Sequence, residues 1–107
     1  DFTAFVYGDK DGFWPGYILK LKAGESPLLL ASGVVKIETD TALIYSFFAQ
    51  APGIASPAFR DAQLSGNPVR ELTFTQKPSA FIYGWVKSQY LIIGTSEEAV
   101  KSAISRL

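Results

Sequence analysis

Hydrophobic and polar residues alternate along two stretches near the N-terminus of the chain. Residues 2–7 are rich in β-branched and aromatic side chains, and residues 16–22 direct successive side chains to opposite faces. Glycine and aspartate residues that favour turns lie between them, at 8–12. The pattern predicts a β-hairpin with residues 13–15 in its connection.

A helical segment follows this hairpin. Ser26 followed by Pro27 is typical of a helix start, because serine caps the first turn and proline suits the first helical position. Helical character extends to about Ala49, although Gly33 and several β-branched residues weaken the middle. The sequence predicts either one bent helix or two helices that meet near Thr39–Asp40.

The second half of the chain contains strand-like segments and a final helix. The strands are expected at 59–64, as a short edge strand, and at 69–76, 80–86 and 89–94. A two-residue connection at Lys87-Ser88 is expected between the last two strands. Thr95-Ser-Glu-Glu98 matches a capping box and predicts an amphipathic helix with one apolar face, formed by Ala99, Val100, Ala103, Ile104 and Leu107.

This order of elements predicts an α+β fold. Short turns between neighbouring strands favour a mostly antiparallel sheet, and we expect a two-layer sandwich with the helices packed on one face. The length of 107 residues indicates a single domain, 1–107. The chain begins at Asp1 without an initiator methionine, so we expect a domain excised from a longer chain or a processed protein.

The amino-acid composition excludes several kinds of chemistry. The chain has no histidine, cysteine or methionine, which removes thiol mechanisms, most nucleophile–base pairs and most transition-metal sites. Ten basic and ten acidic residues cancel, so no long-range field attracts nucleic acid. No apolar run approaches the roughly 18 residues that span a bilayer, and we expect no membrane insertion by the domain itself. We predict no cofactor and no metal site.

The first hairpin connection is the candidate ligand-binding site. Loops on a rigid sheet commonly carry recognition, and a tryptophan beside carboxylates offers an apolar face with hydrogen-bond acceptors. A calcium loop is excluded because Phe13 and Lys20 occupy positions that need oxygen ligands. The alternative is an inert turn whose aromatic residues cover the end of the sheet or lie in the core. The candidate residues for a small glycan or ligand are Asp9, Asp11, Phe13, Trp14 and Tyr17.

Paired carboxylates are the only catalytic route that the composition leaves open. Glycoside hydrolysis needs two of them about 5–9.5 Å apart in a cleft. The sequence gives no reason for any two to meet, so we predict no catalytic residue and regard a carboxylate-dependent hydrolase as an alternative only. The acidic residues considered are Asp9, Asp11, Asp40, Asp61, Glu71, Glu97 and Glu98.

Three segments carry a resemblance to known proteins: residues 66–74, residues 79–86 and the Tyr-Leu-Ile-Ile-Gly-Thr-Ser run at 90–96. They resemble the extracytoplasmic α+β domains of uncharacterised, membrane-anchored bacterial proteins of the candidate-phyla type. The resemblance implies a location in the cell envelope or at the cell surface and an anchor outside this chain. It assigns no functional residue.

The expected function is therefore a non-enzymatic interaction or structural domain. The expected partner is another protein or a copy of the chain itself, and not nucleic acid. The alternatives are the aromatic ligand-binding module and the hydrolase.

Overall fold

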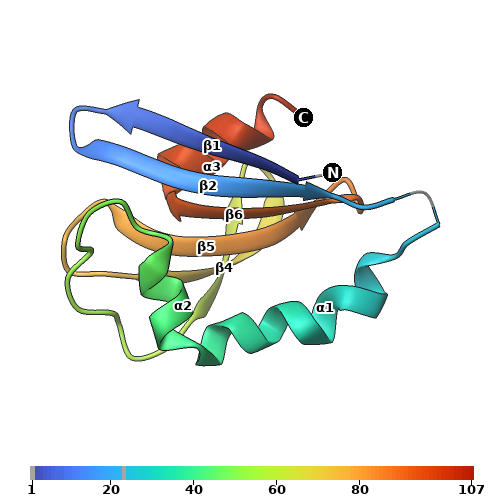
Figure 1. Ribbon diagram of the computed structural model, residues 1–107, viewed down its shortest axis with the longest axis horizontal. Helices are drawn as coiled ribbons and strands as arrows, with labels where there is room; N and C mark the ends of the chain where they lie inside the picture. The colour runs from blue at the N-terminus through green and yellow to red at the C-terminus, as the bar shows by residue number, and fades with distance from the viewer. Residues whose placement is uncertain (1, 23) are drawn as a thin grey trace.

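Strands form one antiparallel sheet in the computed structural model, which describes residues 2–22 and 24–107, with 28–30 by their backbone only (Figure 1). The strands are β1 (Phe2–Asp9), β2 (Gly12–Lys20), β3 (Arg60–Leu64), β4 (Asn67–Thr73), β5 (Ser79–Val86) and β6 (Tyr90–Ser96). The helical elements are α1 (Pro27–Val35), a 3₁₀ turn η1 (Lys36–Thr39), α2 (Thr41–Ser46) and α3 (Glu97–Ile104). The predicted α+β class with an antiparallel sheet is confirmed.

The strand order across the sheet is β1-β2-β6-β5-β4-β3. Strands β3 to β6 form a meander, β1 and β2 form a hairpin, and the pairing of β2 with β6 joins the two groups. The connection from β2 to β3 carries α1, η1 and α2 across one face of the sheet, and the chain then enters the edge strand β3 (Figure 1). This arrangement leaves β1 and β3 as the two edges of the sheet.

Each face of the sheet buries its own apolar cluster, because successive side chains of a strand point to opposite faces. On one face, Ile82 of β5 belongs to the same cluster as Val100 of α3. On the other face, Phe81 belongs to a second cluster with Ile44 of α2. Helix α3 therefore covers one face, and α1, η1 and α2 lie against the other (Figure 1).

The expected packing of all helices on one face of a two-layer sandwich is therefore not confirmed. The physical reason lies in β5, where every residue from Ser79 to Val86 except Trp85 is buried. A strand that is buried on both sides needs an apolar layer on both sides. The helices supply those two layers.

The helical connection follows the second of the two predicted alternatives. It begins at Pro27, as expected, and breaks at Asp40, so that α1 with η1 and α2 are separate elements. The Asp40 carboxylate accepts a hydrogen bond from the backbone N–H of Leu43 at 3.0 Å and so caps α2. Helix α2 ends at Ser46, earlier than the expected end near Ala49.

The cap of the last helix lies one residue later than the predicted capping box. The Ser96 hydroxyl accepts a hydrogen bond from Ala99 N–H at 3.1 Å. The Thr95 hydroxyl instead donates to the carbonyl of Pro15 at 2.8 Å, across to β2. The buried face of α3 contains Ala99, Val100 and Ala103, all members of the predicted apolar face.

Close packing of α3 on β6 predicts a large effect of one methyl group at Gly94. A Cβ atom there would lie 2.5 Å from Cγ2 of Val100, which is fully buried. We expect Gly94→Ala to reduce the free energy of unfolding by about 1–3 kcal/mol through overpacking.

Gly33→Ala is the matched control, because a Cβ atom at Gly33 in α1 would meet nothing within 4 Å. It should stabilise the protein by about 0.5–1 kcal/mol, since alanine is the better helix former. Unfolding in urea gives the free energy of unfolding of both variants. Equal stability of the two variants would contradict this description of the α3–β6 contact.

Candidate functional site

The first hairpin is tighter than the sequence suggested. Residues Phe13 and Trp14 are not in a loop but in β2, where they pair with Gly8 and Tyr7 of β1. The pair Asp9–Gly12 closes the hairpin, so the connection contains only residues 10–11. The expectation of a longer loop is wrong because the aromatic residues continue the strand pairing.

Asp9 and Trp14 are joined in a local hydrogen-bond arrangement at this turn. The Trp14 indole Nε1–H donates to Asp9 Oδ1 at 3.0 Å, and the Asp11 backbone N–H donates to the same oxygen at 2.8 Å. The indole bond is the largest cause that lowers the pKa of Asp9. Trp14 is 1% exposed, so its aromatic face is not offered to a ligand.

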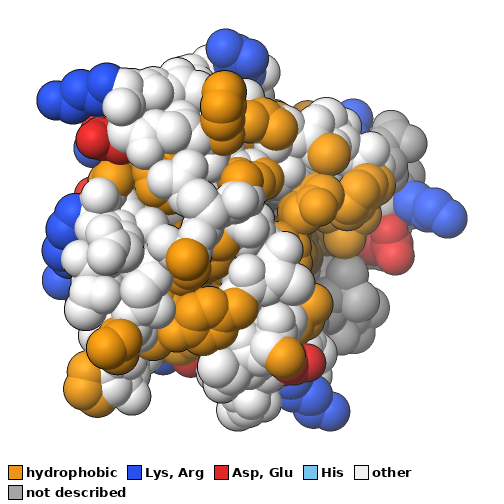
Figure 2. All heavy atoms as spheres, turned by 60° about the vertical axis from the view of Figure 1, so that its left-hand side comes forward, with side chains coloured by type: hydrophobic (Ala, Val, Ile, Leu, Met, Phe, Trp, Pro, Cys, Tyr) orange, Lys and Arg blue, Asp and Glu red, His pale blue; other side chains and the backbone are white. Residues whose placement is uncertain are grey.

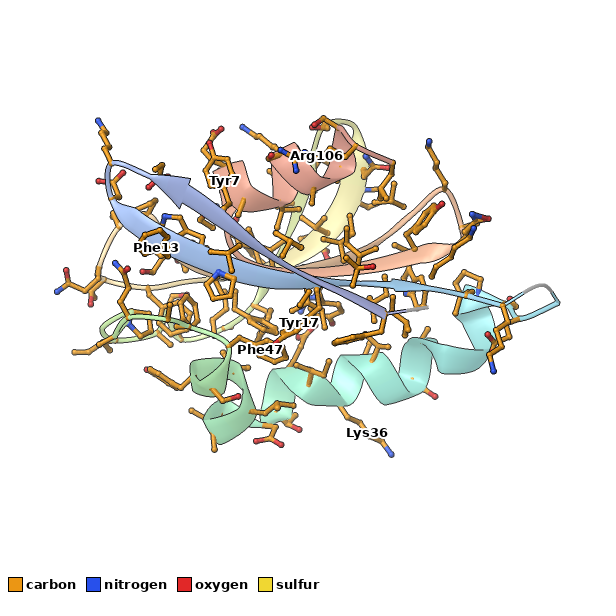
Figure 3. All side chains as sticks on the ribbon, turned by 45° about the horizontal axis from the view of Figure 1, so that its top comes forward. Tyr7, Phe13, Tyr17, Lys36, Phe47 and Arg106 are labelled. Atoms are coloured by element: carbon orange, nitrogen blue, oxygen red, sulfur yellow. The ribbon has the colours of Figure 1, made fainter. Side chains whose placement is uncertain are left out.

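Tyr17 belongs to a row of aromatic rings on the face of the sheet that α2 covers. Its ring stacks on Phe2 at 5.1 Å between centroids and meets Phe47 edge-on at 5.5 Å (Figure 3). Trp14 and Tyr17 are three positions apart on β2 and therefore face opposite sides of the sheet. Of the three predicted aromatic residues, only Phe13 is largely exposed, at 65%.

The five predicted residues therefore share one hairpin without forming a continuous aromatic surface. Figure 2 looks toward the side of the molecule where β1 turns into β2. It shows apolar side chains spread across the middle of this face, with lysine and arginine side chains at its outline. The geometry favours a structural role for Asp9, Trp14 and Tyr17.

Sequence reasoning missed a cavity that is lined by acidic residues from β4 and α3. Glu71 of β4 is 1% exposed, and its Oε1 accepts hydrogen bonds from the Arg60 guanidinium at 2.7 and 3.1 Å. Its other oxygen, Oε2, is buried without a partner among the described residues. Glu97, the first residue of α3, lines the same cavity of about 310 Å³, as does Glu98.

The proximity of Glu71 changes the ionisation of Glu97. Hydrogen bonding to Glu71 is the largest cause that raises the pKa of Glu97, followed by burial. We expect a proton held by Glu97 to be donated to Glu71, which would supply a partner for the buried Oε2. It also avoids placing two negative charges in contact at the junction of α3 with the sheet.

A second charged cluster lies on the opposite face and was also missed. Arg70 of β4 donates to both Glu38 carboxylate oxygens at 2.9 Å and to Asp61 at 2.9 Å. The hydroxyl of Tyr83, the neighbour of Arg70 on β5, donates to Glu38 as well. The bonds from Arg70 are the first cause that lowers the pKa of Glu38. This cluster links η1 to the sheet.

The Glu71–Glu97 pair predicts a specific dependence of stability on pH. The pKa of Glu97 is raised on folding, so its contribution is complete below the ordinary value near 4.5 and is lost as pH rises through the folded pKa. Glu97→Gln keeps a hydrogen-bond donor at every pH. We expect it to match the wild type at low pH and to exceed its stability by about 1 kcal/mol above the transition.

Unfolding in urea from pH 4 to pH 8 measures this difference. Glu98→Gln is the matched control on the same helical turn, because Glu98 is exposed and forms only a 3.5 Å ion pair with Lys101. Its difference from the wild type should stay nearly constant. A constant difference for Glu97→Gln as well would refute the shared proton.

Wider comparisons add no assignment to this geometry. Among the described residues, no helix is long and apolar enough to cross a membrane, and no three acidic residues are grouped as a metal site. The chain matches no protein-family model, no curated protein and no solved structure. The function is therefore argued from the surfaces of the domain itself.

Proposed function

We propose that this is a non-enzymatic interaction domain of a membrane-anchored bacterial protein, located outside the cytoplasm. Its partner is another protein or a second copy of the chain. The binding element in this proposal is the outer edge of β1, where an extended segment of the partner adds as a further strand. The observation that carries the proposal is the unprotected, apolar character of that edge.

Strand β1 has the properties of an edge that accepts a partner strand. It is eight residues long and has a neighbour on one side only. In an antiparallel pair, every second residue directs its N–H and C=O groups away from the neighbour, where they stay available. Phe2 and Val6 are 67% and 65% exposed, and no charged residue lies between Phe2 and Gly8. These features are those used in recognition by strand addition.

The opposite edge is protected in the manner of soluble proteins. Strand β3 has five residues, and Arg60 and Asp61 place charges at its start. Those charges are engaged with Glu71 and Arg70 of β4. Short, charged edge strands oppose association, whereas long apolar ones favour it. The contrast between the edges supports β1 as the binding element.

The two alternative functions receive less support. The aromatic ligand site lacks an exposed Trp14, as described above. Glu71 and Glu97 line one cavity, which is the feature that would favour a hydrolase. However, hydrogen bonding to Glu71 is the first cause that raises the pKa of Glu97, which indicates a closer approach than the separation of about 5–9.5 Å that glycoside hydrolysis needs. The envelope location rests on the resemblance of residues 66–96.

A peptide that copies residues 2–8 tests strand addition directly, because it presents the same apolar edge to the protein. We expect it to perturb the NMR amide signals of β1 selectively and to slow their hydrogen exchange. Val6→Lys places a charge on the edge and should weaken this binding about tenfold or more.

Val35→Lys is the matched control, since Val35 is 53% exposed on α1, away from the edge. It should leave peptide binding unchanged. The absence of any β1 response at millimolar peptide, with no self-association of the domain by sedimentation at similar concentrations, would refute the proposal.

A further inference from the structure

A groove of about 410 Å³ lies between the inner face of the first hairpin and α3. Its walls are mainly apolar and include Phe5 and Ile18 from the hairpin and Ala99 and Ala103 from α3. Its volume falls in the range of sites for small organic molecules, roughly 300–1,000 Å³. Strand β1, including Val6, forms one wall of the groove, and neither carboxylate cluster contributes to it.

The charged side chains that line the groove are cationic. Lys20 and Arg106 line it together with hydroxyl groups such as that of Tyr7, and among the described residues no aspartate or glutamate side chain does so. Figure 3 shows Tyr7 on β1 and Arg106 after α3, on the same side of the sheet. Where the chain is described, Arg106 forms no salt bridge.

The two cationic residues come from the same end of the groove. Lys20 pairs with Tyr90 at the start of β6, and its ammonium lies 6.0 Å from the centre of the Tyr90 ring. The segment after α3 reaches the same region, since the carbonyl of Leu107 accepts a hydrogen bond from Lys87 in the β5–β6 turn at 2.6 Å. The groove thus carries its two cationic residues toward one end, and apolar side chains with a few hydroxyl groups line the rest.

We propose that this groove binds a small amphiphile with a carboxylate head and an aliphatic tail. The head lies beside Arg106, because a guanidinium holds a carboxylate by two parallel hydrogen bonds. The tail lies along Phe5, Ile18 and Ala103, where apolar contact area is gained. Charge favours this ligand class, since no aspartate or glutamate side chain among the described lining residues pairs with a cationic head, whereas Arg106 pairs with an anionic one.

Sodium octanoate is the probe, with octanol and octylammonium as its neutral and cationic counterparts. In an NMR titration of the domain, octanoate should shift the signals of residues lining the groove, with a dissociation constant on the order of 1 mM. Octanol should bind several-fold more weakly, and octylammonium should not bind in the groove.

Two variants test the two halves of the groove. Arg106→Gln should weaken octanoate binding about tenfold and reduce the preference over octanol. Ser102→Phe fills the groove from α3 and should weaken octanoate and octanol alike. Lys36→Gln is the charge control, because Lys36 points away from the sheet on the opposite side of the molecule (Figure 3).

Thermal melts of each variant without ligand establish that the fold is retained. Three results would overturn the proposal: octanoate shifts outside the groove, equal binding of octanol, or octanoate binding unchanged by Arg106→Gln or by Ser102→Phe. None of these results bears on strand addition at β1, which is tested with the peptide.

Discussion

Burial of β5 on both sides is the constraint on which the rest of the fold depends. Phe81 and Ile82 are fully buried although they are adjacent and face opposite sides of the sheet. Water must be excluded from both sides at once, and one layer of helices does not do this. The chain meets the constraint by placing β6 beside β5, turning α3 back over one face, and passing the β2–β3 connection across the other. The topology follows from the need to cover one central apolar strand twice.

Strand β4 likewise directs charged side chains to both faces of the sheet. Arg70 and Glu71 are neighbours in the chain, so their side chains lie on opposite faces of the sheet. Arg70 links one face to η1 through Glu38, and on the other face Glu71 lines the same cavity as Glu97 at the start of α3. Each helical layer is therefore held by an apolar cluster and by a buried or half-buried polar contact near its edge. Such contacts require specific partners, which favours one register of each layer over shifted alternatives.

The sequence predicted local structure well and the relations between distant segments poorly. All the strands, the start of the helical segment at Pro27 and the helix after residue 96 were predicted, because periodicity and capping are local signals. The run at 80–86, which contains no charged residue, was the available sign of burial on both faces, whereas the prediction placed the helices on one face only. The partnerships of Glu71 with Glu97 and of Arg70 with Glu38 join residues 26 and 32 positions apart. They depend on strand order and on helix placement, which no local pattern contains. In the first hairpin, Phe13 and Trp14 directly follow the turn-forming residues 8–12. The sequence therefore did not indicate that both residues pair with β1.

The distribution of polar contacts also separates β1 from the rest of the domain. Asp9, Glu38, Glu71, Arg60 and Arg70 are engaged with partners inside the fold and leave few groups for chemistry. Strand β1 is different, because its neighbour β2 satisfies only one of its edges and its inner face borders the groove beside α3. The Phe5 ring closes against Gly16, where a Cβ atom would lie 2.2 Å from it, so the hairpin is held together closely at its centre. A strand that is fixed at its centre and open along one edge and one face gives a rigid surface, and binding to it costs little ordering of the chain.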